Sequence, residues 1–146
     1  MSDEQPVLVD VADGVMTITL NRPKAKNAVN KAMAEGVAAA MDELDSNDAI
    51  RVGIITGAGG TFCAGMDLKA GAEGHRSTEE FMELMGTVPN IHWQALLRDN
   101  RPNKPLILAV EGYALAGGTE ILAGTDIRVA AEDATFGVTE VARGLY

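Results

Sequence analysis

The spacing of apolar and polar positions at the start of the chain predicts a pair of strands. In "VLVDVADGVMTITLN", residues 7–21, Thr17 and Thr19 alternate with apolar neighbours such as Ile18. Alternation with a period of two is typical of a half-buried strand. Ala12-Asp13-Gly14 interrupts the pattern, so we expect a turn there that joins two strands.

A helix is expected after a proline-containing loop at residues 21–30. Asn30 is a residue type that caps helix N-termini. After it, Met33, Val37, Met41 and Leu44 recur at intervals of three or four residues. This spacing predicts one apolar face of a helix that ends near "NDAI".

The rest of the chain continues the alternation of strands and helices. "RVGIITG" (51–57) and "LILAV" (106–110) are apolar runs typical of strands buried on both faces. "TDIRVAA" and "EDATFGVTEV" predict further strands, and residues 78–88 have helical spacing. The order predicts one α/β domain over residues 1–146 with partly parallel strands.

Composition and charge exclude several classes of protein. The chain has 146 residues and a net charge of −9, which argues against a nucleic-acid-binding face. Its two histidines, His75 and His92, lack metal-ligand spacing, and Cys63 is the single cysteine. No apolar run approaches the ~20 residues of a membrane span. The acidic N-terminus lacks the features of a signal peptide, which favours a cytoplasmic protein.

Two glycine-rich turns are the first candidate for chemistry. "TFCAGMDL" (61–68) and "ALAGGTE" (114–120) each follow a predicted strand and precede a predicted helix. N–H groups in the first turn of a helix have no internal partner, so one from each turn could form an oxyanion hole. Tight turns alone would also explain the glycines. Nucleotide motifs fit poorly, because "GAGGTF" lacks the third glycine of GxGxxG and Met66 stands where a P-loop has lysine.

Two glutamates are the second candidate. Glu120 follows the second glycine turn, and Glu140 comes twenty residues later, after "TFG". Two carboxylates that share a partly apolar site can divide acid and base roles. The alternative is a pair of surface glutamates, one of them stabilised in the first turn of a helix.

These motifs together resemble the crotonase family, the enoyl-CoA hydratase/isomerase group. The resemblance rests on "LNRPKAKNAVN" (20–30), "ITGAGGTFCAGMDLKA" (55–70) and the stretch from Lys104 to Val141. It implies a spiral of ββα units that binds an acyl-CoA thioester. In that family C-terminal helices complete the site, so the resemblance also implies that the chain lacks this helical region.

The resemblance assigns roles to particular residues. It implies Ala64 and Gly117 as the oxyanion-hole donors, Glu120 as the base that holds water and Glu140 as the acid. Further positions would bind the substrate, namely Lys24, Lys26, Ala28, Gly65, Met66 and Asp67.

An enoyl-CoA hydratase is therefore the expected function. It would need no cofactor, because coenzyme A is part of the substrate, and β-oxidation is the default pathway. The family also implies a homo-oligomer, either a trimer or a dimer of trimers. An isomerase of the same family and a non-catalytic acyl-CoA-binding remnant are the alternatives. Residues 70–104 carry no diagnostic motif and either shape the acyl pocket or belong to the core.

Overall fold

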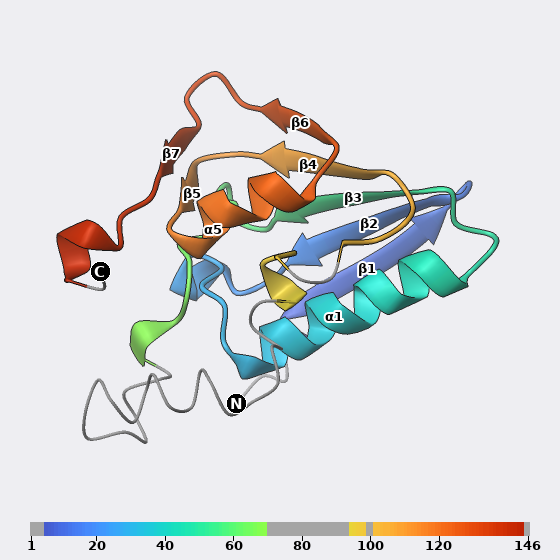
Figure 1. Cartoon of the computed structure of the whole chain (residues 1–146), viewed down its shortest axis with the longest axis horizontal. Coiled ribbons are helices and arrows are strands. Elements are labelled where there is room, and N and C mark those ends of the chain that lie inside the picture. Colours follow the sequence, from blue (N-terminus) through green and yellow to red (C-terminus); the bar gives the residue numbers. More distant parts are fainter. Residues whose placement is uncertain (1–4, 70–93, 99–100, 145–146) are drawn as a thin grey trace.

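A five-stranded sheet organises the chain (Figure 1). The structure is a computed structural model that describes residues 5–69, 94–98 and 101–144. The strands lie in the order β1 (Val7–Ala12), β2 (Val15–Leu20), β3 (Val52–Gly57), β4 (Leu106–Val110) and β6 (Ile127–Ala130). β1 is antiparallel to β2, and every other neighbouring pair is parallel. The expected α/β class with partly parallel pairing is confirmed.

The hairpin between β1 and β2 turns where the sequence predicts it. Its register pairs Val7 with Leu20 and Ala12 with Val15. Asp13 and Gly14 occupy the two turn positions with φ of 52° and 80°. A two-residue turn with positive φ at both positions matches the right-handed twist of the strands, which explains the Asp-Gly pair.

Helix α1 (Lys31–Ser46) runs alongside β1 and β2 and covers one face of the sheet (Figure 1). The side chain of Asn30 accepts a hydrogen bond from the Met33 N–H at 3.0 Å, which confirms the predicted cap. The helix buries the predicted apolar stripe and three alanines: Met33, Ala34, Val37, Ala38, Ala40, Met41 and Leu44.

The centre of the sheet is packed too tightly for extra side-chain atoms. Ile55 on β3 and Leu106 and Leu108 on β4 are fully buried. A Cβ added to Gly53 would lie 2.8 Å from the side chain of Leu44 and 2.9 Å from that of Leu106. The residues that alternate with these are half-buried, so the second face is less covered than the apolar runs predict.

A second, shorter layer of extended segments follows the ends of the main strands. β5 (Tyr113–Leu115) pairs in parallel with β7 (Thr135–Gly137), Cys63 bridges to Ala114, and Val29 bridges to Met66. Each parallel strand of the main sheet is therefore followed by a short segment that pairs with its counterpart in the next unit. This is the repeated ββα pattern that the resemblance implies.

Short helices connect these layers: η1 (Pro23–Ala25), α5 (Gly117–Glu120), η2 (Ile121–Gly124) and η3 (Val141–Arg143). A further helical segment begins at Leu68, as the glycine-rich turn before it predicts, and the helix expected within 78–88 lies outside the described residues. In the described part of the chain, no helix combines the length and apolar character needed to span a membrane.

Candidate functional site

The predicted site residues all follow the carboxyl ends of parallel strands. Lys24, Lys26 and Ala28 come after β2, residues 64–67 after β3, Gly117 and Glu120 after β4, and Glu140 after β6. In Figure 1 these strands point toward the end of the sheet where β5, α5 and β7 lie. Ligands of open α/β sheets bind at this edge, because its loops converge there.

The two glycine-rich turns are in direct contact. A Cβ built on Gly65 would lie 2.8 Å from the Ala116 Cβ, 3.1 Å from the Leu115 carbonyl oxygen and 3.3 Å from the Gly117 nitrogen. A Cβ on Gly118 would overlap the Cys63 carbonyl oxygen. Glycine is therefore required at both positions so that the backbones can approach each other.

The amide of Ala64, which the sequence implicates in the oxyanion hole, is already engaged. Its N–H donates to the Lys26 carbonyl oxygen at 3.0 Å. This bond joins the loop after β2 to the turn after β3. Ala64 therefore has a structural bond where a ligand-binding amide needs an open donor, and the structure does not support it as a donor.

The Met66 amide is positioned differently. Val29 donates to the Gly65 carbonyl at 2.8 Å and accepts from the Asp67 N–H at 2.9 Å. The Gly65 carbonyl and the Met66 N–H belong to one trans peptide and point in opposite directions, so the Met66 N–H points away from Val29. Within the described residues, neither this N–H nor that of Gly117 has an acceptor. Met66 and Gly117 therefore carry the open donors. The difference between Met66 and Ala64 depends on the orientation of their peptide groups, which residue types do not reveal.

A strained residue sets the start of α5. Ala116 has φ 51° and ψ −125°, a combination that glycine adopts more readily. The Ala116 N–H donates to the Gly137 carbonyl at 2.7 Å, and its own carbonyl accepts from the Thr119 N–H at 2.8 Å. These bonds hold the turn that presents the Gly117 N–H.

Glu140 contains a buried oxygen without a partner. Its Oε2 atom is inaccessible to solvent and has no hydrogen-bond partner among the described residues. A buried carboxylate oxygen without a partner costs stability, so it calls for an explanation. The alternative of an ordinary surface glutamate therefore does not describe Glu140.

Glu120 ends α5 and is half-buried. Its Oε2 lies 3.9 Å from Nη1 of Arg98, and its side chain is 27% exposed. The neighbouring Thr119 hydroxyl accepts from the Gly137 N–H at 3.1 Å, which attaches α5 to β7. Glu140 follows Gly137 by three residues, and consecutive Cα atoms are about 3.8 Å apart. The chain therefore brings the segments that carry both glutamates together.

Lys24 and Lys26 are exposed near η1, on the same edge of the sheet. Lys26 has φ 51°, and its Nζ lies 5.5 Å from the centroid of the Tyr113 ring. This is cation–π distance, so the ring stabilises the ammonium group without neutralising it. The Ala28 carbonyl is occupied, because it accepts from the Arg22 guanidinium at 2.5 Å.

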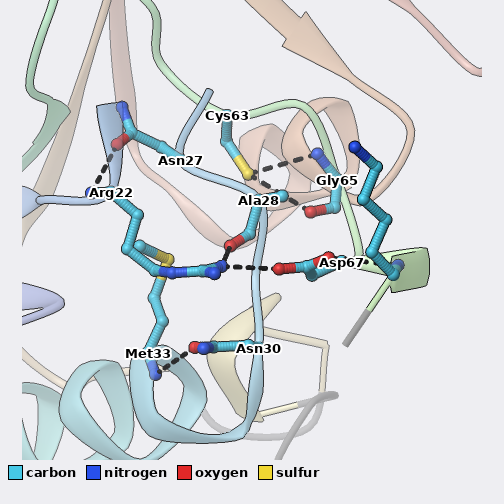
Figure 2. Close-up of polar contacts among 9 residues, drawn as sticks. Arg22, Asn27, Ala28, Asn30, Met33, Cys63, Gly65 and Asp67 are labelled. Carbon is cyan, nitrogen blue, oxygen red and sulfur yellow. Dashed lines mark hydrogen bonds and ion pairs between the residues drawn. The ribbon is translucent and has the colours of Figure 1, made fainter. Parts of the chain in front are cut away.

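Two residues that the sequence analysis did not single out hold this region together (Figure 2). Asn27 is fully buried, accepts from the Arg22 N–H at 2.8 Å, and donates to the carbonyls of Ala58 at 2.9 Å and Thr61 at 2.6 Å. Arg22 bonds to Asp67 at 2.9 Å. Their position in the motif "NRPKAKN" was the only sequence feature that could have pointed to them, because most of their hydrogen-bond partners are far away in the sequence.

The Cys63 thiol is buried in the first glycine-rich turn. Burial raises the pKa of the Cys63 thiol from 9.0 to about 11, and the nearby Gly65 backbone lowers it less. A thiol with so high a pKa is a poor nucleophile near neutral pH. Within the described residues, no group of three or more His, Cys, Asp or Glu side chains could hold a metal ion.

Fold and site together define a ββα-repeat protein in which two glycine-rich turns touch each other. The segments that carry Glu120 and Glu140 follow parallel strands at the same edge of the sheet. Residues 10–146 match the profile of the family described as "Enoyl-CoA hydratase/isomerase". The chain belongs to this family, and its fold is the crotonase fold.

Individual relatives support this assignment. The chain is 48% identical over 139 residues to the enoyl-CoA hydratase EchA19 of Mycobacterium tuberculosis, a match that spans 95% of this chain and 51% of the relative. It is 41% identical to the mevalonyl-coenzyme A hydratase sidH of Aspergillus fumigatus, over 90% of this chain and 46% of the relative. The crystal structure of EchA1, an enoyl-CoA hydratase from Mycobacterium marinum, superposes with a TM-score of 0.82 at 51% identity, covering 97% of this chain and 52% of that one. The chain thus spans about half the length of the relatives it matches.

Proposed function

We propose that the protein is an enoyl-CoA hydratase, which adds water to a trans-2-enoyl-CoA and yields a 3-hydroxyacyl-CoA. The observation that carries this proposal is the contact between the Gly65 and Ala116 turns, because it brings two open backbone N–H groups into one neighbourhood. Such a pair suits an oxygen atom that gains negative charge during a reaction. The hydratase names of the relatives support the choice of reaction.

In this proposal, Met66 and Gly117 bind the thioester carbonyl oxygen of the substrate. Their two N–H groups stabilise the enolate that forms when water attacks the β-carbon. Removing one such donor from the oxyanion hole of a serine protease costs about 3–4 kcal/mol, so the pair would lower the barrier by several kcal/mol. Met66 replaces Ala64 in this role because the Ala64 amide is bonded to Lys26.

The two glutamates would move the protons. Glu120, as a carboxylate, takes a proton from the attacking water, and the resulting hydroxide oxygen bonds to the β-carbon. Glu140, as a carboxylic acid, gives its proton to the α-carbon, so the overall change is the addition of one H₂O. The lack of a hydrogen-bond partner for Glu140 Oε2 among the described residues supports this role, since no structural contact uses that atom.

The remaining site residues would bind the rest of the thioester. Residues 65–67 would line the thioester and the pantetheine arm, and Ala28 would lie near the nucleotide part of coenzyme A. Lys24 and Lys26 are exposed cations at the same edge, which supports a role near the phosphates of coenzyme A in an otherwise acidic chain. Coenzyme A enters as part of the substrate, so the proposed reaction requires no further cofactor.

We also propose that the protein forms a homo-oligomer, a trimer or a dimer of trimers, in the cytoplasm. Support for self-association comes from large apolar side chains exposed on β6, β7 and their neighbours, namely Ile127, Val129, Phe136, Val138 and Val141. Exposed apolar side chains gathered on adjoining elements are typical of protein–protein contacts.

The direct test is the decay of the enoyl-thioester absorbance when the purified protein is mixed with crotonoyl-CoA. We expect rapid decay with formation of 3-hydroxybutyryl-CoA, identified by mass spectrometry. Binding without turnover of any enoyl-CoA would overturn the proposal. Conversion of a 3-enoyl-CoA to the 2-enoyl isomer by the Glu120→Gln variant would instead favour an isomerase, because that reaction needs one proton-transferring carboxylate.

A further inference from the structure

The Arg22 guanidinium connects two segments that flank the candidate site. It leaves the loop after β2 and bonds through Nη1 to the Ala28 carbonyl at 2.5 Å and to Asp67 Oδ2 at 2.9 Å (Figure 2). The side chains of Arg22 and Asp67 are 24% and 12% exposed. A charged hydrogen bond with this degree of shielding is stronger than a surface ion pair.

Asp67 uses both of its carboxylate oxygens. Oδ2 accepts from Arg22, while Oδ1 accepts from the Lys69 N–H at 3.2 Å, where the helical segment begins at Leu68. A side-chain oxygen that caps a helix start fixes the direction in which the chain enters that helix. Arg22 therefore acts on the orientation of the backbone around Asp67.

The hydrogen bonds of Asp67 orient the backbone directly after Met66, whose N–H is open. Met66 lies between Asp67 and Gly65, which has φ 93° and whose carbonyl is bonded to Val29. The backbone before Met66 is flexible, because glycine at position 65 tolerates many conformations. The backbone after Met66 can be held by the charged contact of the Asp67 side chain.

We propose that Arg22 is a positioning residue: through Asp67 and the Ala28 carbonyl, it holds the Met66 N–H in the direction of the substrate carbonyl. The inference rests on the proposed function for the identity of that carbonyl. Arg22 does not touch the reacting atoms in this arrangement. An amide that is misplaced by about 1 Å can lose about 100-fold in rate, so a residue outside the reaction centre can control turnover.

The test uses a readout that does not require turnover. 4-Dimethylaminocinnamoyl-CoA absorbs at longer wavelength when its thioester carbonyl accepts hydrogen bonds. We expect the wild-type protein to shift its absorption maximum to the red on binding. Arg22→Gln should bind the probe within about threefold of wild type but lose most of the shift, with kcat for crotonoyl-CoA about 10- to 100-fold lower and KM little changed. Asp67→Asn should also lose most of the shift. Arg22→Lys, which keeps the charge on a shorter chain, should restore part of the shift.

Arg51→Gln is the matched control. The Arg51 guanidinium also bonds to a backbone carbonyl, that of Asp13 at 3.0 Å, but it lies beside the β1–β2 turn at the opposite end of the sheet. This variant should keep the full shift and turnover. Circular dichroism and thermal unfolding of each variant establish that it is folded before the spectra are compared.

The outcomes separate this inference from the proposed function. A red shift that Arg22→Gln abolishes supports the positioning role even if crotonoyl-CoA is not hydrated, in which case the proposed function fails alone. Hydration with an unchanged shift in both Arg22→Gln and Asp67→Asn overturns the positioning role alone. Weaker binding with an unchanged shift also overturns it, because Arg22 would then contact the ligand directly. A wild-type protein that binds the probe without any shift overturns the positioning role, and the crotonoyl-CoA assay decides separately whether the proposed function fails too.

Discussion

Gly65 and Ala116 lie so close together that a Cβ on Gly65 would be 2.8 Å from the Cβ of Ala116. Two turns from different parts of the sequence are therefore in van der Waals contact, and the Gly117 nitrogen lies 3.3 Å from the same point. The separation between the turns is set by the absence of one methyl group. This makes the spacing of the two candidate donors sensitive to a single substitution.

Gly65→Ala should separate the turns. We expect a loss of about 1–3 kcal/mol in the free energy of unfolding relative to Gly60→Ala, together with at least a tenfold loss of turnover. Gly60 is the matched control because it also has a positive φ, 68° against 93° for Gly65, but an added Cβ would meet nothing within 4 Å. Urea unfolding and crotonoyl-CoA hydration measure the two effects. Equal losses in both variants would show that backbone strain, not contact, determines the cost.

Glu120→Gln and Glu140→Gln should each lower kcat by about 100- to 10,000-fold, because each removes one proton-transferring group. Affinity for a non-reactive acyl-CoA should stay close to that of wild type, as measured by isothermal titration calorimetry. Glu43→Gln, a change at an exposed position on α1, is the control and should retain full activity. Turnover that survives in both site variants would contradict the proposed roles.

Glu140→Gln should also leave the protein at least as stable as wild type. The buried Oε2 has no partner among the described residues, so the substitution breaks no observed hydrogen bond at that atom. Thermal unfolding of the variant measures this effect. A Tm several degrees below that of wild type would show that Glu140 has a structural role.

Cys63 should make the protein less stable at high pH. Below pH 9 both the folded and unfolded chains keep the thiol proton, so the free energy of unfolding does not depend on this group. Between pH 9 and about 11 the unfolded chain ionises while the folded chain does not, because burial raises the folded pKa to about 11. Stability should therefore fall by about 2–3 kcal/mol over this interval.

Denaturant titrations of wild type and Cys63→Ala from pH 8 to pH 11 isolate this contribution. Other groups titrate in the same range, but they are shared by both proteins and cancel in the difference. The alanine variant should be less stable at pH 8, since it leaves a small cavity, and the gap should close as the pH rises. A constant gap would mean that the thiol does not carry this pH dependence.

Val129→Lys combined with Val138→Lys should weaken self-association. The two side chains are 59% and 64% exposed, so lysine should disturb the individual chain little. Val9→Lys is the control, because Val9 is 43% exposed on β1 at the other edge of the sheet. Sedimentation velocity should show smaller species only for the double variant. Loss of assembly with Val9→Lys alone would point to the β1 edge instead.

The sequence was sufficient to predict the features that depend on local pattern. The Asp-Gly turn, the Asn30 cap and the buried face of α1 follow from residue type and spacing, and the structure confirms them. Contact between the two glycine turns also followed, because both come after neighbouring parallel strands.

Features that depend on distant partners could not be predicted in the same way. The amides of Ala64 and Met66 are two residues apart and differ only in the direction of their peptide planes, which the Lys26 and Val29 backbones fix. Arg22 and Asn27 look like ordinary loop residues until their acceptors after β3 are known. Hydrogen bonds between remote segments leave no periodic trace in the sequence.

The contact between the Gly65 and Ala116 turns has a consequence for how the protein folds. These turns meet only after β3 and β4 have paired and their following segments have joined through the Cys63–Ala114 bridge. Such contacts between remote segments form late, because the intervening loops must close first. Ligand binding should therefore report on completion of the whole sheet: a chain that has collapsed and formed its hairpin and first helix would still lack an assembled binding site.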